Sequence, residues 1–346
     1  MSDTLTAISP RDPGAWEQVD ALLRREGIRR DRNLDYTCGI FDSQWNLAAT
    51  GSCFANTIRS LAVDSRRQGE GLLSQVVSHL LEIQASRGNP HVFLYTKPET
   101  ARFFSGLGFY EIARAENDLV FMENRRDGFS RWCAALAEKR REGRAAAVVM
   151  NATPFTLGHL HLVERAAAEW DTVHLFVLSE EAGPIPFAIR RRLAEEGTAH
   201  LPGVVCHGSG PYIISAATFP SYFLREEDSV IRAHACLDLQ LFGAIARRLE
   251  LRCRFVGEEP ASRVTALYNQ IMARRLPELG VQCRIIPRLE RGGRPVSASD
   301  FRLAVHDGAL DRALELLPES GRRFFSGPGA GAVIAAIQAE ENVVHY

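Results

Sequence analysis

The stretch Ala145-Ala-Ala-Val-Val-Met-Asn-Ala-Thr-Pro-Phe-Thr-Leu-Gly-His159 decides how the second half of this 346-residue chain folds. It begins with a short apolar run, typical of a buried strand, and breaks at residues 151–154. It then resumes with the helical spacing of Leu160, Val163 and Ala167. In a parallel sheet, such a junction points backbone N–H groups and the positive end of a helix dipole at one spot. The stretch therefore predicts a phosphate site at the start of the helix.

Three residues of this junction offer suitable chemistry. Thr156 contributes a hydroxyl, Gly158 would let a ligand approach the backbone closely, and His159 could donate to a phosphoryl oxygen from the first helical turn. For a bare T-x-G-H, a helix entry with an incidental histidine is the plainer alternative. The strand before the motif and the apolar helix after it favour the phosphate site.

From residue 145 onward, strand-like and helix-like segments alternate, which predicts a parallel sheet with crossover helices. Ligands of such sheets bind at the carboxyl ends of the strands, where Gly257 and Glu259 are expected. The expected strands are 145–150, 172–178, 203–207, 252–256 and 281–287; the expected helices are 187–200, 236–249, 262–276, one opening at 296, and 307–317.

Residues 1–127 indicate a separate α/β unit, and residues 128–144 a connecting helix that ends near Gly143. The fold class is thus α/β, with a second domain over 145–346. The elements expected in the first unit are helices over 15–25 and 72–86, strands over 36–42, 47–54, 58–63 and 91–95, and a helix ending in 103–109.

The net charge and composition of the chain exclude several classes of protein. A net charge of −1 gives no global field for holding nucleic acid or an anionic membrane. No apolar run approaches the roughly 18 residues of a membrane span. The first residues show no secretory signal, and the seven cysteines are scattered without C-x-x-C. We expect a cytoplasmic protein with reduced thiols and no protein metal site.

Lys97 and Lys139 are the only lysines, and neither lies in the G-x-x-x-x-G-K-[ST] of a P-loop. Any triphosphate must then be held by arginine, histidine and backbone. Arginine suits this task because its planar fork binds phosphate oxygens two at a time.

The first unit resembles the GNAT acetyltransferases. Arg66-Arg-Gln-Gly69-Glu-Gly71 fits their R/Q-x-x-G-x-G/A turn, and residues 101–109 are similar to their late A-x-x-F-Y-x-x-x-G-F segment. The resemblance implies a GNAT-like fold in which Arg66, Gly69 and Gly71 hold a coenzyme-A-like arm. No residue stands out as the base of an acetyltransferase, so binding of the arm and catalysis both stay open.

The second unit resembles the nucleotidyltransferase superfamily, whose signature is T-x-G-H followed far downstream by S-x-S-x-x-R. Here the downstream residues are Ser297, Ser299 and Arg302. The resemblance implies a Rossmann-like domain in which His159 stabilises the transition state at the α-phosphate of ATP. Ser297, Ser299 and Arg302 would hold the β- and γ-phosphates, although serines at a helix start are also ordinary caps.

Residues 150–159 closely resemble the M-N-x-N-P-F-T-L-G-H segment of the citrate lyase ligase family, which joins a GNAT-like domain to a nucleotidyltransferase domain. The segments 208–220, 255–260, 263–270 and 296–302 resemble the same family. Departures are Thr153 in place of an asparagine and Asp300-Phe301 in place of a basic residue and valine. They leave His159 and Arg302 in place.

This resemblance implies an AMP-forming acid–thiol ligase. Acetate would attack the α-phosphate of ATP, giving acetyl-adenylate and pyrophosphate, with Mg²⁺ bound through the phosphates. The prosthetic-group thiol of the acyl carrier protein of citrate lyase would then take the acetyl group and release AMP. Neither nucleic acid nor membrane is an expected partner.

Three further residues have open roles. Arg190 stands near the expected position of a basic residue that neutralises phosphate, whereas its neighbours in the helix are expected to face solvent. Glu259 could orient ribose or metal, or could be an exposed glutamate in a turn. Arg263 could hold the acetate carboxylate or a phosphate, or form a surface ion pair.

Three alternative functions remain. A sister ligase for the malonate decarboxylase carrier protein would use the same chemistry. A nucleotide adenylyltransferase would not explain an attached coenzyme-A-binding fold. An acetyl-CoA-dependent acetyltransferase would leave the intact T-x-G-H and S-x-S-x-x-R unexplained.

Overall fold

The computed structural model describes residues 3–31, 33–115, 118–181, 183–213, 219, 227–258 and 263–340. The chain divides into two compact units, one of residues 1–129 with 220–237 and one of residues 130–219 with 238–346. Within the described ranges, no helix is both long enough and apolar enough to cross a membrane.

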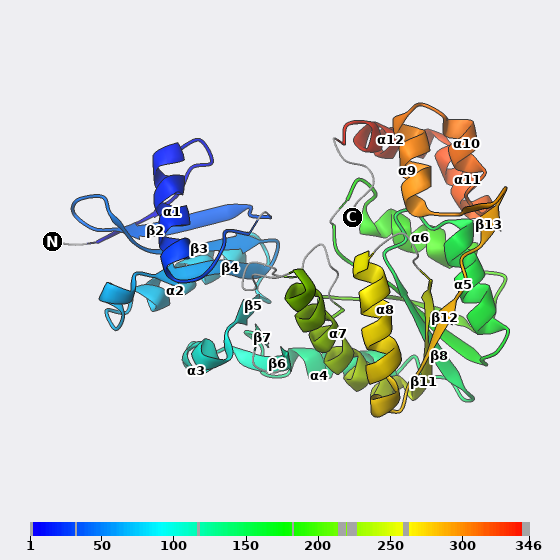
Figure 1. Cartoon of the computed structure of the whole chain (residues 1–346), viewed down its shortest axis with the longest axis horizontal. Coiled ribbons are helices and arrows are strands. Elements are labelled where there is room, and N and C mark those ends of the chain that lie inside the picture. Colours follow the sequence, from blue (N-terminus) through cyan, green and yellow to red (C-terminus); the bar gives the residue numbers. More distant parts are fainter. Residues whose placement is uncertain are drawn as a thin grey trace. The chain divides into compact units, whose positions relative to one another are not determined.

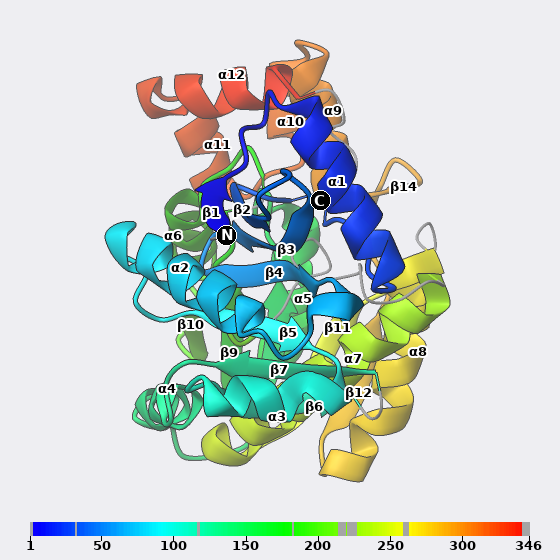
Figure 2. The same ribbon diagram turned by 90° about the vertical axis from the view of Figure 1, so that its left-hand side faces the viewer.

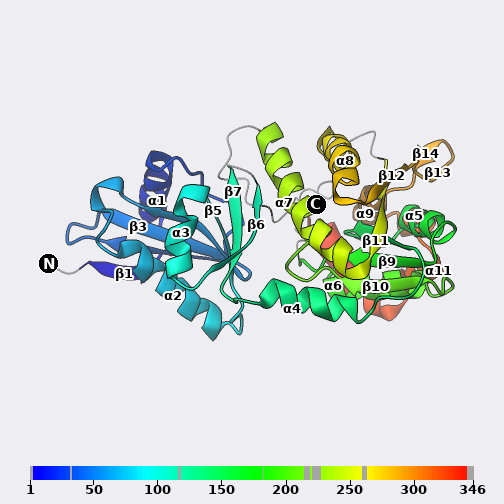
Figure 3. The same ribbon diagram turned by 90° about the horizontal axis from the view of Figure 1, so that it is seen from below.

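The second unit contains a five-stranded parallel sheet (Figure 3) with the order β10-β9-β8-β11-β12. Its strands are β8 (Ala145–Met150), β9 (Thr172–Val177), β10 (Val204–Gly208), β11 (Leu251–Gly257) and β12 (Gln282–Ile286). The chain builds outward from β8 in one direction through β9 and β10, and in the other through β11 and β12. The carboxyl ends of β8 and β11 therefore mark the switch point at which open parallel sheets bind ligands.

Helices connect these strands, as the sequence predicts. They are α5 (Leu157–Ala167), α6 (Phe187–Gly197), α7 (Glu227–Leu249) and α8 (Arg263–Arg275). After β12 follow a short hairpin of β13 (Glu290–Arg291) and β14 (Arg294–Pro295), and the helices α9 (Ala298–His306), α10 (Leu310–Leu314), α11 (Glu319–Phe325) and α12 (Gly331–Gln338). Figure 1 shows α9 to α12 gathered at one end of this unit. Phe155, Phe301 and Phe325 join them to the sheet in one buried core.

The first unit is a mixed sheet with the order β1-β2-β3-β4-β5-β7-β6 (Figure 2). The strands are β1 (Thr4–Ala7), β2 (Tyr36–Phe41), β3 (Leu47–Phe54), β4 (Thr57–Val63), β5 (Phe93–Thr96), β6 (Tyr110–Ala115) and β7 (Leu119–Glu123), and the helices are α1 (Pro13–Arg25), α2 (Leu72–Ser86) and α3 (Pro98–Gly106). β4 and β5 are parallel and pair only at Thr57–Phe93 and Ile58–Leu94. The α/β class predicted for this unit is confirmed.

α1 and α2 cover opposite faces of this sheet. Ile40 packs in the cluster that contains Val76 and Leu80 of α2, whereas the next residue, Phe41, packs in the cluster that contains Leu22 of α1. Successive side chains of a strand point to opposite faces, so each helix buries one face of the sheet.

Several helices differ from their predicted bounds, and α10, predicted over 307–317, covers only Leu310–Leu314. The helix predicted over 129–144 is α4 (Gly128–Ala137), which ends before the run Lys139-Arg140-Arg141. These adjacent positively charged residues lie beyond the end of the helix. There Arg140 bonds to Glu250, and Arg141 donates to the carbonyl of Pro202. α7 begins at residue 227 and not at about 236; its first turn contains Asp228, and an acidic residue stabilises the N-terminus of a helix.

Candidate functional site

The start of α5 is fixed by a reciprocal pair of side chains. Thr156 is the N-cap, and its Oγ1 accepts from the backbone N–H of His159 at 3.4 Å. In return, Nδ1 of His159 accepts from the backbone N–H of Thr156 at 3.0 Å and lies 2.9 Å from Oγ1. His159 thus lies in the first turn, where the sequence places it, and the two residues form a capping box.

This geometry determines which tautomer His159 adopts. Because Nδ1 accepts from a backbone N–H, it carries no proton, and the neutral ring must carry its proton on Nε2. Burial lowers the pKa of His159 to about 4, and the positive charges of Arg288 and Arg302 add to the effect. Near neutral pH the residue is therefore an uncharged imidazole that can donate from Nε2.

Arg302 joins the two motifs that are far apart along the chain. Its buried guanidinium donates from Nη1 to the carbonyl of Thr153 at 2.6 Å, and from Nη2 to the hydroxyl of Ser299 at 3.2 Å. Thr153 lies in the loop between β8 and α5. The S-x-S-x-x-R segment and the T-x-G-H loop are therefore in direct contact at the switch point of the sheet.

Ser297 caps α9, which is the plainer role considered for it. Its Oγ accepts from the backbone N–H of Asp300 at 3.0 Å and donates to the carboxylate of Asp300 at 2.7 Å. The aspartate that stands where a basic residue is commoner in the family thus holds the Ser297 hydroxyl. Any phosphate that binds Ser297 has to compete with this carboxylate.

Gly158 permits a close approach of another part of the chain, and its approach to a ligand stays a prediction. A Cβ at this position would lie 2.7 Å from the carbonyl oxygen of Val296, the residue before the α9 cap. The backbone N–H of Val296 in turn donates to the carbonyl of Leu289 at 2.8 Å. The glycine therefore lets the segment leading into α9 pack against the first turn of α5, which brings the two helix N-termini together.

The carboxyl end of β11 lies beside that of β8 in the parallel sheet. Gly257 ends this strand, as predicted, and its carbonyl accepts from the buried side chain of Asn269 in α8 at 3.0 Å. Arg263 is exposed and begins α8. Glu259 lies outside the described residues. Within the described ranges, no group of three or more His, Cys, Asp or Glu side chains is placed to hold a metal ion.

Arg190 lies beneath the site as a buried residue of α6. Its guanidinium donates to protein carbonyls, among them those of Asn151 at 2.8 Å, Leu178 at 2.8 Å and Ile185 at 3.0 Å, and that of Glu180. These carbonyls belong to the loops that follow β8 and β9. In this arrangement Arg190 organises the carboxyl edge of the sheet, and its phosphate contact remains a prediction.

Arg288 is a residue of the site for which the sequence suggested no role. It follows β12, and its Nε donates to the carbonyl of Glu258 at 2.8 Å. It contributes more than Arg302 to lowering the pKa of His159. The sequence shows only a basic loop, in which nothing distinguishes Arg288 from Arg291 and Arg294.

Comparison with known proteins identifies the family. Residues 145–325 match the model of the citrate lyase ligase C-terminal domain. The citrate (pro-3S)-lyase ligase of Klebsiella pneumoniae is 39% identical over 298 residues, which cover 84% of this chain and 87% of that protein. This chain belongs to the citrate lyase ligase family. The predicted resemblance is confirmed, and the chain is an enzyme of the ligase type with a citrate lyase ligase function.

Two further relatives carry the same description. The ligase of Escherichia coli K12 is 34% identical, and the alignment covers 92% of each chain. That of Haemophilus influenzae is 31% identical, with 87% of this chain and 92% of the relative covered. The similarity thus extends over both units of the family member described here.

Solved structures are similar to about a third of the chain. Escherichia coli ElaA has a TM-score of 0.32 at 15% identity, covering 36% of this chain and all of that one. A GNAT-family acetyltransferase from Staphylococcus aureus MU50 has a TM-score of 0.30 at 15% identity, covering 35% of this chain and 98% of that one.

In the first unit of this ligase, the predicted arm-binding turn precedes α2. Gly69 and Gly71 adopt positive φ angles of 89° and 77°, which favour glycine, and Gly71 caps α2 without a side-chain hydrogen bond. Arg66 is exposed and forms two hydrogen bonds with Asp64, at 2.9 and 2.6 Å, which hold the pKa of that carboxyl well below its usual range. The turn thus presents backbone N–H groups at a helix start.

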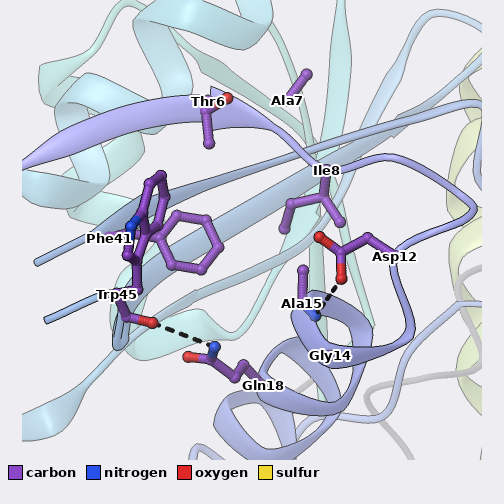
Figure 4. Close-up of a pocket in the computed structure, with 9 residues that line it drawn as sticks. All are labelled: Thr6, Ala7, Ile8, Asp12, Gly14, Ala15, Gln18, Phe41 and Trp45. Carbon is purple, nitrogen blue, oxygen red and sulfur yellow. Dashed lines mark hydrogen bonds between the residues drawn. The ribbon is translucent and has the colours of Figure 1, made fainter.

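A cavity of about 450 Å³ lies elsewhere in the same unit (Figure 4). It opens between β1, the first turn of α1 and the β2–β3 turn, and its lining includes Phe41, Trp45 and Gln18, whose side chain donates to the carbonyl of Trp45 at 3.2 Å. None of the sequence-predicted residues lines it, so it forms no part of either predicted binding site.

Proposed function

We propose that this ligase activates acetate with ATP and passes the acetyl group to the prosthetic-group thiol of the acyl carrier protein of citrate lyase. The observation that carries the proposal is the contact of Arg302 with the carbonyl of Thr153, at 2.6 Å. This contact supports a single site to which both the T-x-G-H loop and the S-x-S-x-x-R helix contribute. A single ATP can then be reached by both.

In the first step, a carboxylate oxygen of acetate attacks the α-phosphorus, and the bond to the bridging oxygen of the β-phosphate breaks. The products are acetyl-adenylate and pyrophosphate. The chain supplies orientation and charge stabilisation and needs no covalent intermediate. Nε2–H of His159 donates to the α-phosphoryl oxygen, which gains negative charge as the step proceeds. Mg²⁺ enters with ATP, bound to its phosphates.

In the second step, the thiol attacks the acetyl carbonyl of the adenylate, and AMP leaves with the electron pair of the broken C–O bond. The thiol belongs to a dephospho-coenzyme-A derivative on the carrier protein. We assign the turn of Arg66, Gly69 and Gly71 to the pyrophosphate of this arm, because a helix start with free backbone donors suits that group. Residues 1–127 would thus bind the arm and residues 145–346 perform the activation.

ATP–pyrophosphate exchange tests the first step. Exchange that depends on acetate is the expected result. An adenylyltransferase would exchange pyrophosphate in response to a phosphorylated acceptor and not to acetate. Turnover of acetyl-CoA without any exchange would refute the proposal and point to an acetyltransferase.

Substitution of the glycines tests the arm-binding turn. Gly69→Asp and Gly71→Asp place a carboxylate and a side chain at positive φ, so the KM for the thiol carrier should rise while acetate-dependent exchange stays intact. Gly88→Asp is the matched control, because Gly88 has a φ of 79°, follows the same helix and has no atom within 4 Å of its would-be Cβ. An unchanged KM in folded Gly69→Asp and Gly71→Asp would remove the turn from the mechanism.

A further inference from the structure

The basic loop over residues 288–294 contains three arginines that face different surroundings. Nη1 of Arg291 donates to the carbonyl of Glu315 at 3.0 Å, which directs it toward the end of α10. Arg294 lies on the exposed strand β14. Arg288 alone among the three is half-buried and lies at the carboxyl end of the parallel sheet.

Two backbone contacts place Arg288 beside the candidate ATP site. Its Nε is held by the carbonyl of Glu258, and the N–H of Glu258 donates to the carbonyl of Ile286 at 2.8 Å, so the ends of β11 and β12 are tied together around it. The next residue, Leu289, accepts from the N–H of Val296, whose own carbonyl faces Gly158. One short chain of contacts therefore connects Arg288 to the first turn of α5.

The charge distribution agrees with this position. Of the arginines near His159, Arg288 and Arg302 are the two whose charges lower its pKa, and Arg288 has the larger effect. Arg302 is buried and donates to Thr153 and Ser299. Arg288, by contrast, is half-buried just beyond the carboxyl end of β12.

We infer that Arg288 binds the pyrophosphate half of ATP and neutralises it as the leaving group of acetate activation, an inference that rests on the proposed function. When the α-phosphorus–oxygen bond breaks, the electron pair goes to the β-phosphate oxygen and the charge on the departing pyrophosphate increases. A guanidinium can bind two of its oxygens at once. Arg288 thus acts on the leaving group while His159 acts on the α-phosphate.

Steady-state exchange measurements on Arg288→Gln test this inference. Loss of one charge-assisted phosphate contact should raise the KM for pyrophosphate about tenfold or more, while the KM for acetate stays within about twofold of the wild-type value. Arg288→Lys keeps the charge but loses the planar, bidentate guanidinium. Its KM for pyrophosphate should therefore lie between the values of the wild type and of Arg288→Gln. Arg294→Gln removes a charge from the same loop and should behave as wild type.

Two readouts separate this inference from the function on which it depends. If the wild type shows no acetate-dependent exchange, the proposed function fails, and calorimetric binding of inorganic pyrophosphate still tests Arg288. Weaker binding in Arg288→Gln than in the Arg294→Gln control supports the role, and equal binding overturns it. If Arg288→Gln does not fold, the Lys variant decides: a KM for pyrophosphate equal to the wild-type value would overturn the bidentate contact.

Discussion

The structure predicts that His159 works as a neutral imidazole and keeps working at acidic pH. Its Nδ1 accepts from the N–H of Thr156, and its pKa is lowered from 6.5 to about 4, so protonation costs about 3 kcal/mol more than in water. At pH 5.5, a group with a pKa of 6.5 would be about nine-tenths protonated, whereas His159 should be almost entirely neutral. The step that depends on His159 should therefore lose little activity between pH 7 and pH 5.5.

The assay is the pH dependence of kcat/KM for ATP in acetate-dependent exchange at saturating acetate. ATP loses and gains a proton on its own terminal phosphate in this range, so His159→Gln is needed as a control. Its residual profile contains the substrate's titration alone. We expect the ratio of wild-type to variant activity to stay flat down to about pH 5. A roughly tenfold fall in that ratio by pH 5.5, with an apparent pKa close to 6.5, would refute the reasoning. An NMR titration that gave His159 a pKa close to 6.5 would refute it as well.

Three further predictions follow from buried contacts in the same unit. The Cβ of Gly158→Ala would lie 2.7 Å from the carbonyl oxygen of Val296. We expect urea melts to show a loss of about 1–3 kcal/mol in unfolding free energy. Isotope exchange should show a fall in the rate of ATP–pyrophosphate exchange of roughly 10²-fold. His174 and His207 share a hydrogen bond of 2.8 Å, and burial lowers the pKa of both side chains. Below about pH 6.5 the unfolded state therefore binds more protons than the folded state, and the unfolding free energy should fall as the pH drops. The double variant His174→Gln, His207→Gln should show a weaker dependence of stability on pH in melts at pH 7 and pH 5. Arg190→Met should leave several buried carbonyls without donors and cost roughly 2–5 kcal/mol in unfolding free energy, whereas a purely ligand-binding arginine would leave the melting curve unchanged.

The junction of β8 and α5 could be predicted from the sequence because its structure depends on residues that are close together along the chain. An apolar strand, a break and a helix start with Thr156 and His159 follow from residue types within fifteen positions, and the structure places each element there. The meeting of Thr153 with Arg302 is different, since 149 residues separate them. Only the family resemblance suggested that pairing, and no spacing along the chain implies it.

The role of Arg190 was obscured by its neighbours, although the sequence contains a signal for it. The sequence suggests a solvated face for Arg191 and Arg192 and a phosphate contact for Arg190, not a structural role in the core. Arg190, however, shares helical spacing with Leu193, Ala194 and Gly197, which are all buried. Read with a period of 3.6 residues, this pattern places the first arginine of the run in the core.

The position of Arg288 could not be predicted from the sequence, for a different reason. Its loop has no periodicity, and the directions of its arginines depend on the hairpin of β13 and β14 and on the glycines at its tip, Gly292 and Gly293, with φ angles of 58° and 74°. Composition alone cannot resolve these directions.

The two capped helices together explain how the site can attract phosphate. Gly158 and Val296 bring the N-termini of α5 and α9 into contact, so the positive ends of two helix dipoles lie at the switch point beside Arg302. Each N-terminus is already capped by a side chain, one by Thr156 and the other by Ser297. A phosphate must therefore exchange with existing hydrogen bonds, and it gains most where charge develops during the reaction. Under the proposed function, such a site would favour the departing pyrophosphate and the α-phosphate in the transition state over the ground state of ATP, which is the condition for catalysis rather than for binding alone.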